Sequence, residues 1–140
     1  RELFERPRHT FVGYFIGSPG MNLIDVRAET DAVVFGDVRL ALPDGLRERL
    51  AAMAGGRLQV GIRPEFVQLW DGPFDDAHPA RVLDVEDLGT YRIVTLELGG
   101  VALKARLSED RPLPVELAWV SLPAQWLMLY VDDVLLEAGP

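Results

Sequence analysis

The sequence predicts an all-β domain of mostly antiparallel strands, with one N-terminal helix and one short internal helix. The strongest observation is an alternation of apolar and polar side chains over 80–88, 91–98 and 101–107, which is typical of a three-stranded meander. Gly89–Thr90 and Gly99–Gly100 provide the turns between these strands. The length of 140 residues and the apolar fraction of 49% suffice for one domain with a core of its own.

A helix is expected within residues 1–18, because apolar side chains recur there at helical spacing. Phe11 and Phe15 are four residues apart, so they lie on one face of a helix. Gly17 can take the left-handed conformation that ends a helix, and Pro19 prevents the helix from resuming. The chain opens without a methionine, in what resembles a helix already under way, and we expect it to be a piece of a longer protein.

The next part of the chain is expected to form short strands and one surface helix. Gly36–Asp37 suits a tight turn between two short apolar runs, which predicts a β-hairpin. Leu46, Leu50 and Met53 recur at helical spacing, and Gly55–Gly56 ends that helix, whose apolar stripe is expected to pack on a sheet. The strands predicted here are 22–28, 32–35 and 38–42, with a turn at 29–31.

Prolines divide the later strands. Pro64 removes a backbone hydrogen-bond donor after a strand at 57–63, so the chain must bend or lie at a sheet edge there. An extended apolar run resumes at 66–70, and the polar loop 71–79 is expected to be the seam between two sub-barrels. A short turn or a single helical turn is expected at 123–125. The remaining predicted strands are 115–121, 126–131 and 134–137.

Composition argues against catalysis and against nucleic-acid binding. The chain has no cysteine, and its only lysine, Lys104, is in a predicted strand rather than in a phosphate-binding G-x-x-x-x-G-K-[ST] loop. His9 and His78 are the only histidines and lie far apart in the sequence. The acidic clusters are expected to cap turns rather than to bind a metal; they lie at 75–76, 84–87 and 132–133. A net charge of −8 opposes contact with phosphate backbones. We therefore expect the chain alone neither to bind nor to hydrolyse ATP.

Three stretches resemble one known family and occur in the family's order. Residues 2–24, ELFERPRHTFVGYFIGSPGMNLI, resemble the junction in ATP-binding subunits of ABC importers for sugars and glycerol phosphate, where the ATPase domain leads into a C-terminal regulatory domain. Residues 60–69, VGIRPEFVQL, resemble the family's Gly-Ile-Arg-Pro-Glu-His signature, with Phe66 where the family usually has His. Leu88–Gly89 resembles the start of a TOBE-type oligonucleotide-fold segment. A second departure is Arg8–His9, which replaces the usual Ala-Asn.

This resemblance implies a TOBE barrel similar to the oligonucleotide fold, with additional strands. Residues 1–18 would be the terminal helix of an ATPase domain, and 19–140 the regulatory β-domain. In the family, such domains are not catalytic, hold two ATPase subunits together and can accept regulatory proteins. The residues implied at the domain junction are Phe15, Gly17, Ser18, Pro19, Met21 and Asn22.

The resemblance also implies partners, cofactors and location. The expected partners are a second copy of the chain, the ATPase domain, membrane permease subunits and a regulatory protein. No cofactor is expected in this chain, whereas the whole subunit would use ATP and magnesium for uptake of sugars or polyol phosphates. No apolar run approaches the roughly 20 residues that span a bilayer. We expect a soluble domain in the cytoplasm, held at the inner membrane by the transporter complex.

The candidate interface centres on Arg63-Pro64-Glu65. Arg63 and Glu65 flank a proline kink and are expected to pair with each other or with a second subunit. A two-fold homodimer interface is expected within 61–69 and 115–128, which are rich in apolar side chains and short of acidic ones. The candidate residues are Gly61, Ile62, Arg63, Pro64, Glu65, Phe66, Trp119 and Trp126.

Two other functions remain open on the residues alone. One is a barrel that binds a small oxyanion such as molybdate at a subunit interface, although an acidic chain with one lysine disfavours an anion site. The other is an oligonucleotide binder, which the net charge disfavours. Four aromatic residues could stack a ligand, but they alternate with aliphatic residues and are expected to pack in the core or an interface; they are Trp70, Trp119, Trp126 and Tyr130.

Overall fold

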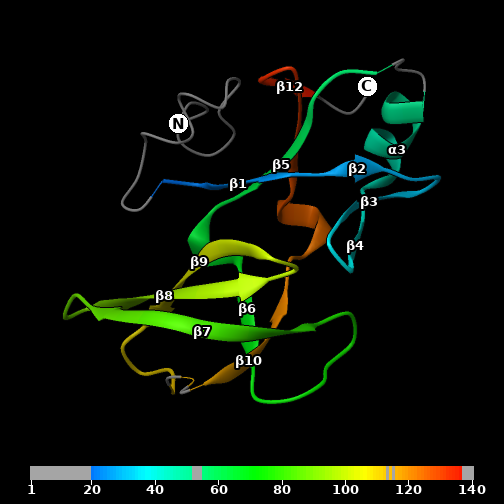
Figure 1. Ribbon diagram of the computed structural model, residues 1–140. Coiled ribbons are helices and arrows are strands. Elements are labelled where there is room, and N and C mark those ends of the chain that lie inside the picture. The colour runs from blue at the N-terminus through cyan, green and yellow to red at the C-terminus, as the bar shows by residue number, and fades with distance from the viewer. Residues whose placement is uncertain (1–19, 52–54, 113, 115, 137–140) are drawn as a thin grey trace.

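The chain folds as three antiparallel sheets connected by short turns (Figure 1). The computed structural model describes residues 20–51, 55–112, 114 and 116–136, so the helix expected within residues 1–18 lies outside the described part. Every strand pair in this part is antiparallel. The prediction of an all-β, mostly antiparallel fold is confirmed.

The first sheet has four strands in the order β1-β5-β11-β12. Its members are β1 (Asn22–Asp25), β5 (Leu58–Ile62), β11 (Met128–Val131) and β12 (Val134–Leu136). The single strand predicted at 22–28 is divided at Val26, whose backbone N–H donates a 3.1 Å hydrogen bond to the carbonyl of Leu58. Residues beyond this point leave the four-stranded sheet and join another one.

The second sheet has three strands in the order β2-β3-β4. It consists of β2 (Arg27–Ala28), β3 (Ala32–Phe35) and β4 (Val38–Ala41). The hairpin predicted around Gly36–Asp37 is confirmed, and Arg39 on β4 forms ion pairs with Glu29 and Asp31 in the turn between β2 and β3. The predicted internal helix follows as α3 (Asp44–Ala51), and no helix in the described part is long and apolar enough to cross a membrane.

The third sheet has five strands in the order β6-β10-β7-β8-β9. These are β6 (Gln68–Trp70), β7 (His78–Asp87), β8 (Tyr91–Leu98), β9 (Val101–Ser108) and β10 (Leu117–Ser121). The predicted meander is present as β7, β8 and β9, with a register shift between Val82 and Asp84. The loop after Trp70, expected as a seam, connects β6 and β7 of this one sheet, so it does not separate two sheets.

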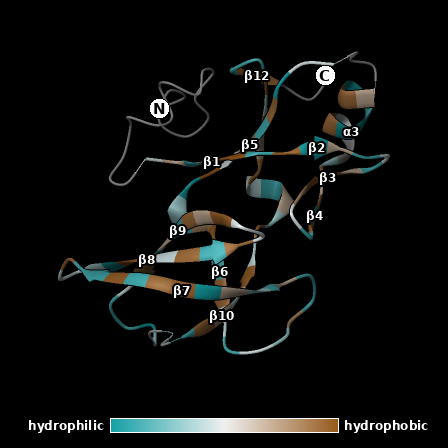
Figure 2. Cartoon of the chain, viewed as in Figure 1, coloured by the Kyte–Doolittle hydropathy of each residue, from teal (hydrophilic) through white to brown (hydrophobic). Residues whose placement is uncertain are grey.

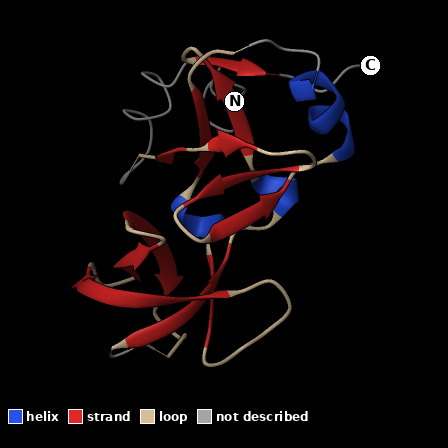
Figure 3. Ribbon diagram, turned by 45° about the vertical axis from the view of Figure 1, so that its right-hand side comes forward, coloured by secondary structure: helices blue, strands red, loops and turns tan. Residues whose placement is uncertain are grey.

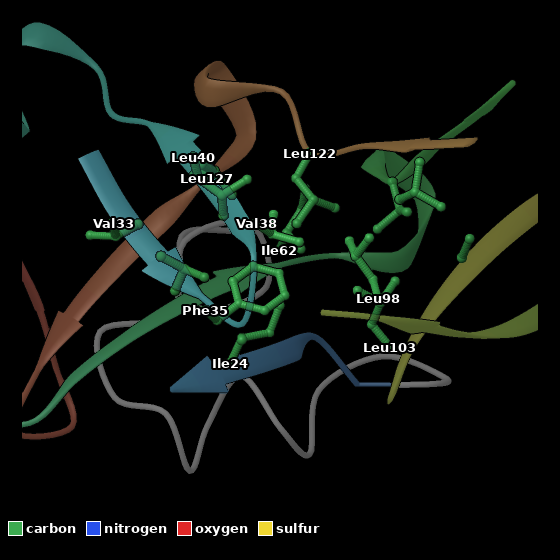
Figure 4. Close-up of a cluster of buried hydrophobic side chains, with 14 of the residues drawn as sticks. Ile24, Val33, Phe35, Val38, Leu40, Ile62, Leu98, Leu103, Leu122 and Leu127 are labelled. Atoms are coloured by element: carbon green, nitrogen blue, oxygen red, sulfur yellow. The ribbon is translucent and has the colours of Figure 1, made fainter. Parts of the chain in front are cut away.

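One contiguous core fills the space among the three sheets. Figure 4 shows Phe35 and Val38 of the hairpin pointing toward Ile24 of β1 and Ile62 of β5, and all four are almost fully buried. Both β8 and β9 carry apolar and polar colours along their length (Figure 2), and buried residues largely alternate with more exposed ones, as expected for strands with one buried face. The alternation in the sequence therefore predicts which side chains of these strands lie in the core.

Two glycine turns from different sheets contact each other next to the core. Gly36, in the β3–β4 turn, has a positive φ of 55°, and a Cβ atom added to it would overlap the carbonyl oxygen of Gly99 in the β8–β9 turn. A Cβ at Gly99 would in turn lie 3.0 Å from the ring and the carbonyl oxygen of Phe35. The absence of side chains at both turns allows the two sheets to approach this closely.

We predict that Gly36→Ala lowers the free energy of unfolding more than Gly100→Ala does. Both residues have positive φ, so both substitutions carry a conformational cost of about 1–2 kcal/mol. Only Gly36→Ala also forces a backbone clash, which adds about 1–3 kcal/mol, whereas a Cβ at Gly100 meets no atom within 4 Å. Urea titration measures both losses, and equal losses would contradict the contact between the two turns.

Candidate functional site

The chain passes between the four-stranded and five-stranded sheets at two 3-10 turns. The first turn, η1 (Pro64–Phe66), connects β5 to β6, and the second, η2 (Ala124–Trp126), connects β10 back to β11. Figure 3 shows both turns at the level between the two sheets. Seven of the eight candidate residues predicted from the sequence lie in η1, in η2 or in the residues that lead into η1, and the eighth, Trp119, lies on β10.

One antiparallel register runs through both sheets at this crossing. Gly61 of β5 is paired with Met128 of β11, and Gln68 of β6 is paired with Ser121 of β10. Each segment advances by seven residues between these two pairs, so the turns interrupt the ladder without shifting it. The two crossing segments form one long ribbon whose ends belong to different sheets.

Prolines explain why the ribbon is interrupted here. Pro64 is the first residue of η1 and Pro123 precedes η2, and each supplies the φ near −65° that starts a helical turn while removing a ladder donor. Phe66 and Trp126, predicted to begin extended runs, therefore lie in the turns, and the strands begin two residues later. The predicted bend at Pro64 and the single helical turn predicted at 123–125 are confirmed.

The two turns place Phe66 and Trp126 face to face. Their ring centroids are 3.9 Å apart and their planes differ by 3°. Trp126 remains 39% exposed, and Phe66 is half-buried. Both residues are candidates from the sequence, but their stacking on each other is not predicted by it. They are 60 positions apart, and only the strand register brings them together.

The other residues of the Arg63-Pro64-Glu65 stretch point to different environments. Arg63 is 2% exposed, and Ile62 and Pro64 are also buried, whereas Glu65 is exposed. None of the ion pairs between described residues connects Arg63 with Glu65. Within the predicted segment 61–69, the surface available to a partner is therefore provided mainly by Glu65, Phe66 and Gln68.

Gly61 permits close packing on the outer side of the four-stranded sheet. A Cβ atom at this position would lie 3.0 Å from the ring of Tyr130 and 3.1 Å from the sulfur of Met21. Tyr130 is fully buried, and its hydroxyl lies 3.8 Å from the sulfur atoms of Met21 and Met128. Tyr130 is thus a packing residue, as expected, and Met21 of the predicted domain junction belongs to the same cluster.

Asn22, another predicted junction residue, connects two sheets through its side-chain amide. Its Nδ2 donates to the carbonyl of Lys104 at 2.9 Å, and its Oδ1 accepts from the N–H of Lys104 at 2.8 Å. Nδ2 also lies 3.2 Å from the carbonyl oxygen of Ile62. The amide therefore replaces a neighbouring strand at the edge of β9, because it carries a donor and an acceptor in the arrangement of a peptide group. The sequence motif marked Asn22 but not its partners.

A second aromatic group lies on β6 and β10. Trp119 is paired with Trp70 in the strand register, and Trp70 stacks on Phe74 with centroids 4.1 Å apart. The indole N–H of Trp70 donates to the hydroxyl of Ser121 at 3.0 Å. Phe74 is 48% exposed and Leu117, on the same strand as Trp119, is 58% exposed. This face of the five-stranded sheet thus presents apolar side chains to solvent.

Two members of the acidic clusters accept hydrogen bonds from backbone N–H groups. Asp87 accepts a 2.9 Å hydrogen bond from the N–H of Gly89, and Asp132 accepts one of 2.9 Å from the N–H of Arg57. No group of three or more His, Cys, Asp or Glu residues within the described part could hold a metal ion. Hydrogen bonds to Glu29 and Asp31 raise the pKa of Arg39, and the Ser108 hydroxyl lowers that of Asp110, so both groups stay charged at neutral pH.

We predict that Asn22→Ala lowers the free energy of unfolding by about 1–3 kcal/mol, since it leaves the edge of β9 and the Ile62 carbonyl without their partner. The N–H of Lys104 should exchange faster in amide exchange measurements. Asn22→Asp should not restore stability, because a carboxylate cannot donate to the two carbonyls. Gln68→Ala, which removes an exposed amide from β6, serves as the control and should change stability by no more than about 0.5 kcal/mol. Unchanged exchange at Lys104 would contradict the bridge.

We also predict that Phe66 and Trp126 stabilise the crossing jointly. Phe66→Ala and Trp126→Ala should each be destabilising, and a double-mutant cycle should give a coupling of about 0.5–1.5 kcal/mol for the stacked pair. The cycle of Phe66→Ala with Phe74→Ala provides the control, since Phe74 stacks on Trp70 instead. Additive losses for Phe66 and Trp126 would mean that the stack contributes nothing of its own.

Two family models match this chain at overlapping segments. The model described as MalK OB fold domain matches residues 17–67, and the model described as TOBE domain matches residues 60–129. The overlap contains the end of β5, η1 and the start of the crossing ribbon.

Similar proteins agree with these matches. The sn-glycerol-3-phosphate import ATP-binding protein UgpC of Chromobacterium violaceum is 38% identical over 133 residues, covering 92% of this chain and 35% of that protein. The sulfoquinovosyl glycerol transport ATP-binding protein SmoE of Agrobacterium fabrum is 37% identical over 117 residues, covering 82% of this chain and 32% of that protein. This chain thus spans about a third of the length of these relatives.

A solved structure shares the fold. The cytoplasmic molybdate-binding protein ModG, with molybdate bound, superposes with a TM-score of 0.59 at 16% identity, covering 79% of this chain and 95% of that chain. The two family matches, by contrast, together cover residues 17–129. The chain therefore belongs to the family of MalK-type OB-fold and TOBE domains found in the ATP-binding subunits of sugar and sugar-phosphate ABC importers.

Proposed function

We propose that this chain is the non-catalytic regulatory and dimerisation domain of an ABC importer ATP-binding subunit that serves the uptake of a sugar or polyol phosphate. The observation that supports this most is the pair of consecutive family matches over residues 17–129, together with relatives whose names are those of import ATP-binding proteins. The whole subunit would bind ATP and magnesium outside this chain and work with permease subunits on the cytoplasmic side of the membrane.

The role of such a domain follows from effective concentration. Two ATPase domains that must meet and separate in each cycle stay close together when a second pair of domains remains in contact. The rigid, doubly crossed ribbon between the sheets suits this purpose, because a connection made of two strands and two stacked rings resists bending. A regulatory protein that binds the same domain would act on both ATPase halves together.

The residues proposed to contact a regulatory protein are those candidates that reach the surface. Glu65 and Trp126 are exposed at the crossing, where the half-buried Phe66 stacks on Trp126, and Trp119 lies near Leu117 on the five-stranded sheet. Gly61 and Arg63 are buried, so they do not form part of this surface.

A small-ligand barrel is the alternative, since the fold resembles that of a molybdate-binding protein. A hollow of about 140 Å³ beside Trp70 contains Arg111 as a cation, but Asp71 lines the same hollow. The guanidinium of Arg111 also donates a 3.3 Å hydrogen bond to the carbonyl of Leu69, so part of its hydrogen-bonding capacity is used within the chain. An acid in the lining and a net charge of −8 disfavour a small oxyanion here.

Two measurements on the 140-residue chain test the proposal. We expect a concentration-dependent dimer in sedimentation up to several hundred micromolar, and no heat of binding in calorimetry with magnesium-ATP, molybdate, sugars or short oligonucleotides. A monomer throughout the series would contradict the dimerisation role. Micromolar binding of ATP would contradict the non-catalytic role, and micromolar binding of molybdate would favour the alternative.

A further inference from the structure

We propose that two copies of this chain contact each other through the outer face of β7, β8 and β9. This inference rests on the proposed dimerisation and names its surface. The outer face is defined by side chains that alternate with core residues on these strands and therefore point away from the core. Its central members are Asp84, Glu86, Ile93, Thr95, Lys104 and Arg106.

Strand register arranges these six side chains in two parallel rows. In the first row, Glu86 on β7 is paired with Ile93 on β8, which is paired with Arg106 on β9. The second row has the same order, with Asp84, Thr95 and Lys104. Each row thus reads acid, uncharged residue, base, and Lys104 is the only lysine of the chain.

These charges are not neutralised by one another. Neighbouring strands lie about 4.8 Å apart, so β7 and β9 are separated by about 10 Å, with β8 between them. None of the ion pairs between described residues includes Asp84, Glu86, Lys104 or Arg106, and all four are exposed. Charges on adjacent strands do pair on this face: Arg81 on β7 and Glu97 on β8 are 3.6 Å apart.

The centre of the outer face is uncharged, and the next register row, which carries Arg81 and Glu97, leads to an exposed apolar residue on β10. Ile93 is 5% exposed although it belongs to neither buried cluster, and Thr95 is half-buried beside it. Leu117 on β10 shares the register row of Arg81 and is 58% exposed. An apolar centre with charges at its margins is the arrangement expected of a protein contact.

Two-fold symmetry turns the rows into a self-complementary surface. When two copies pack face to face with the axis parallel to β8, β7 of one copy lies over β9 of the other. In these two rows each acid then faces a base, Glu86 with the partner copy's Arg106 and Asp84 with the partner copy's Lys104. Glu97 on β8 faces the partner copy's Glu97, and its charge is paired with Arg81 of the same chain. Packed sheets lie about 10 Å apart, a gap that a Glu and an Arg side chain bridge together. An axis across the strands would instead oppose like charges.

A simpler explanation is that these residues only keep the sheet soluble, with Lys104 and Arg106 discouraging strand addition at the edge of β9. That explanation requires charge on β9 but gives no reason for acids on β7 at the matching positions. The two explanations also differ in a measurable way. Solubility depends on the amount of charge, whereas a two-fold contact depends on which strand carries each sign.

Charge-reversal variants separate these possibilities. The basic-face variant carries Asp84→Lys and Glu86→Lys, and the acidic-face variant carries Lys104→Glu and Arg106→Glu. Each should dimerise at least about 100-fold more weakly than the natural chain in sedimentation, because like charges then oppose each other throughout the contact. A 1:1 mixture should form a heterodimer within about tenfold of the natural affinity, since every base again faces an acid. A chain with all four substitutions should regain its homodimer.

Matched controls carry the same charge changes elsewhere. Asp37→Lys with Glu48→Lys and Arg27→Glu with Arg49→Glu change exposed residues on the hairpin, β2 and α3, and should leave the dimer within about threefold. If the natural chain dimerises but both face variants do so equally well, or if their mixture fails to associate, the proposed contact is wrong while the dimerisation role stands. If the natural chain stays monomeric, both are contradicted.

Discussion

The structure depends on one antiparallel ribbon whose two segments each pass between the four-stranded and the five-stranded sheet. Its register continues from the β5–β11 ladder into the β6–β10 ladder, although two 3-10 turns interrupt it. Because both crossings use the same register, a change in length of either turn would shift one sheet against the other. The stacked rings of Phe66 and Trp126 fill the position where the ladder hydrogen bonds are missing. The core contains residues from both sheets, so its packing depends on the relative position of the sheets that this ribbon sets.

Local patterns in the sequence predicted most strands, since alternation and turn residues act over a few positions. The hairpin around Gly36–Asp37 and the meander of β7, β8 and β9 agree with their predicted positions to within two residues. The sequence predicts strands at Phe66 and Trp126, because apolar character alone does not distinguish an extended residue from one in a 3-10 turn. In both cases the proline nearby was the relevant signal, and its preset φ decided the local conformation.

Features that depend on distant residues could not be predicted. Asn22 was marked by its motif, yet its hydrogen bonds to Lys104 join positions 82 residues apart, and only the packing of two sheets brings them together. The burial of Arg63 was likewise hidden, since a charged residue before a proline is usually assigned to the surface. The predicted interface segment 61–69, which is defined by its apolar residues, therefore contains many residues that are buried in the chain. The exposed part of the candidate site becomes visible only once the ribbon is in place.

An acidic chain that forms pairs faces a general electrostatic constraint. With a net charge of −8, two copies repel each other at distances comparable to the Debye length, which is about 8 Å at physiological ionic strength. Association then requires a region where opposite charges meet without bringing other acids together. Two neighbouring register rows provide such a region, because each places an acid on β7, an uncharged residue on β8 and a base on β9. Since the register of these two rows sets which charges meet, the contact can be specific even though the chain as a whole is strongly acidic.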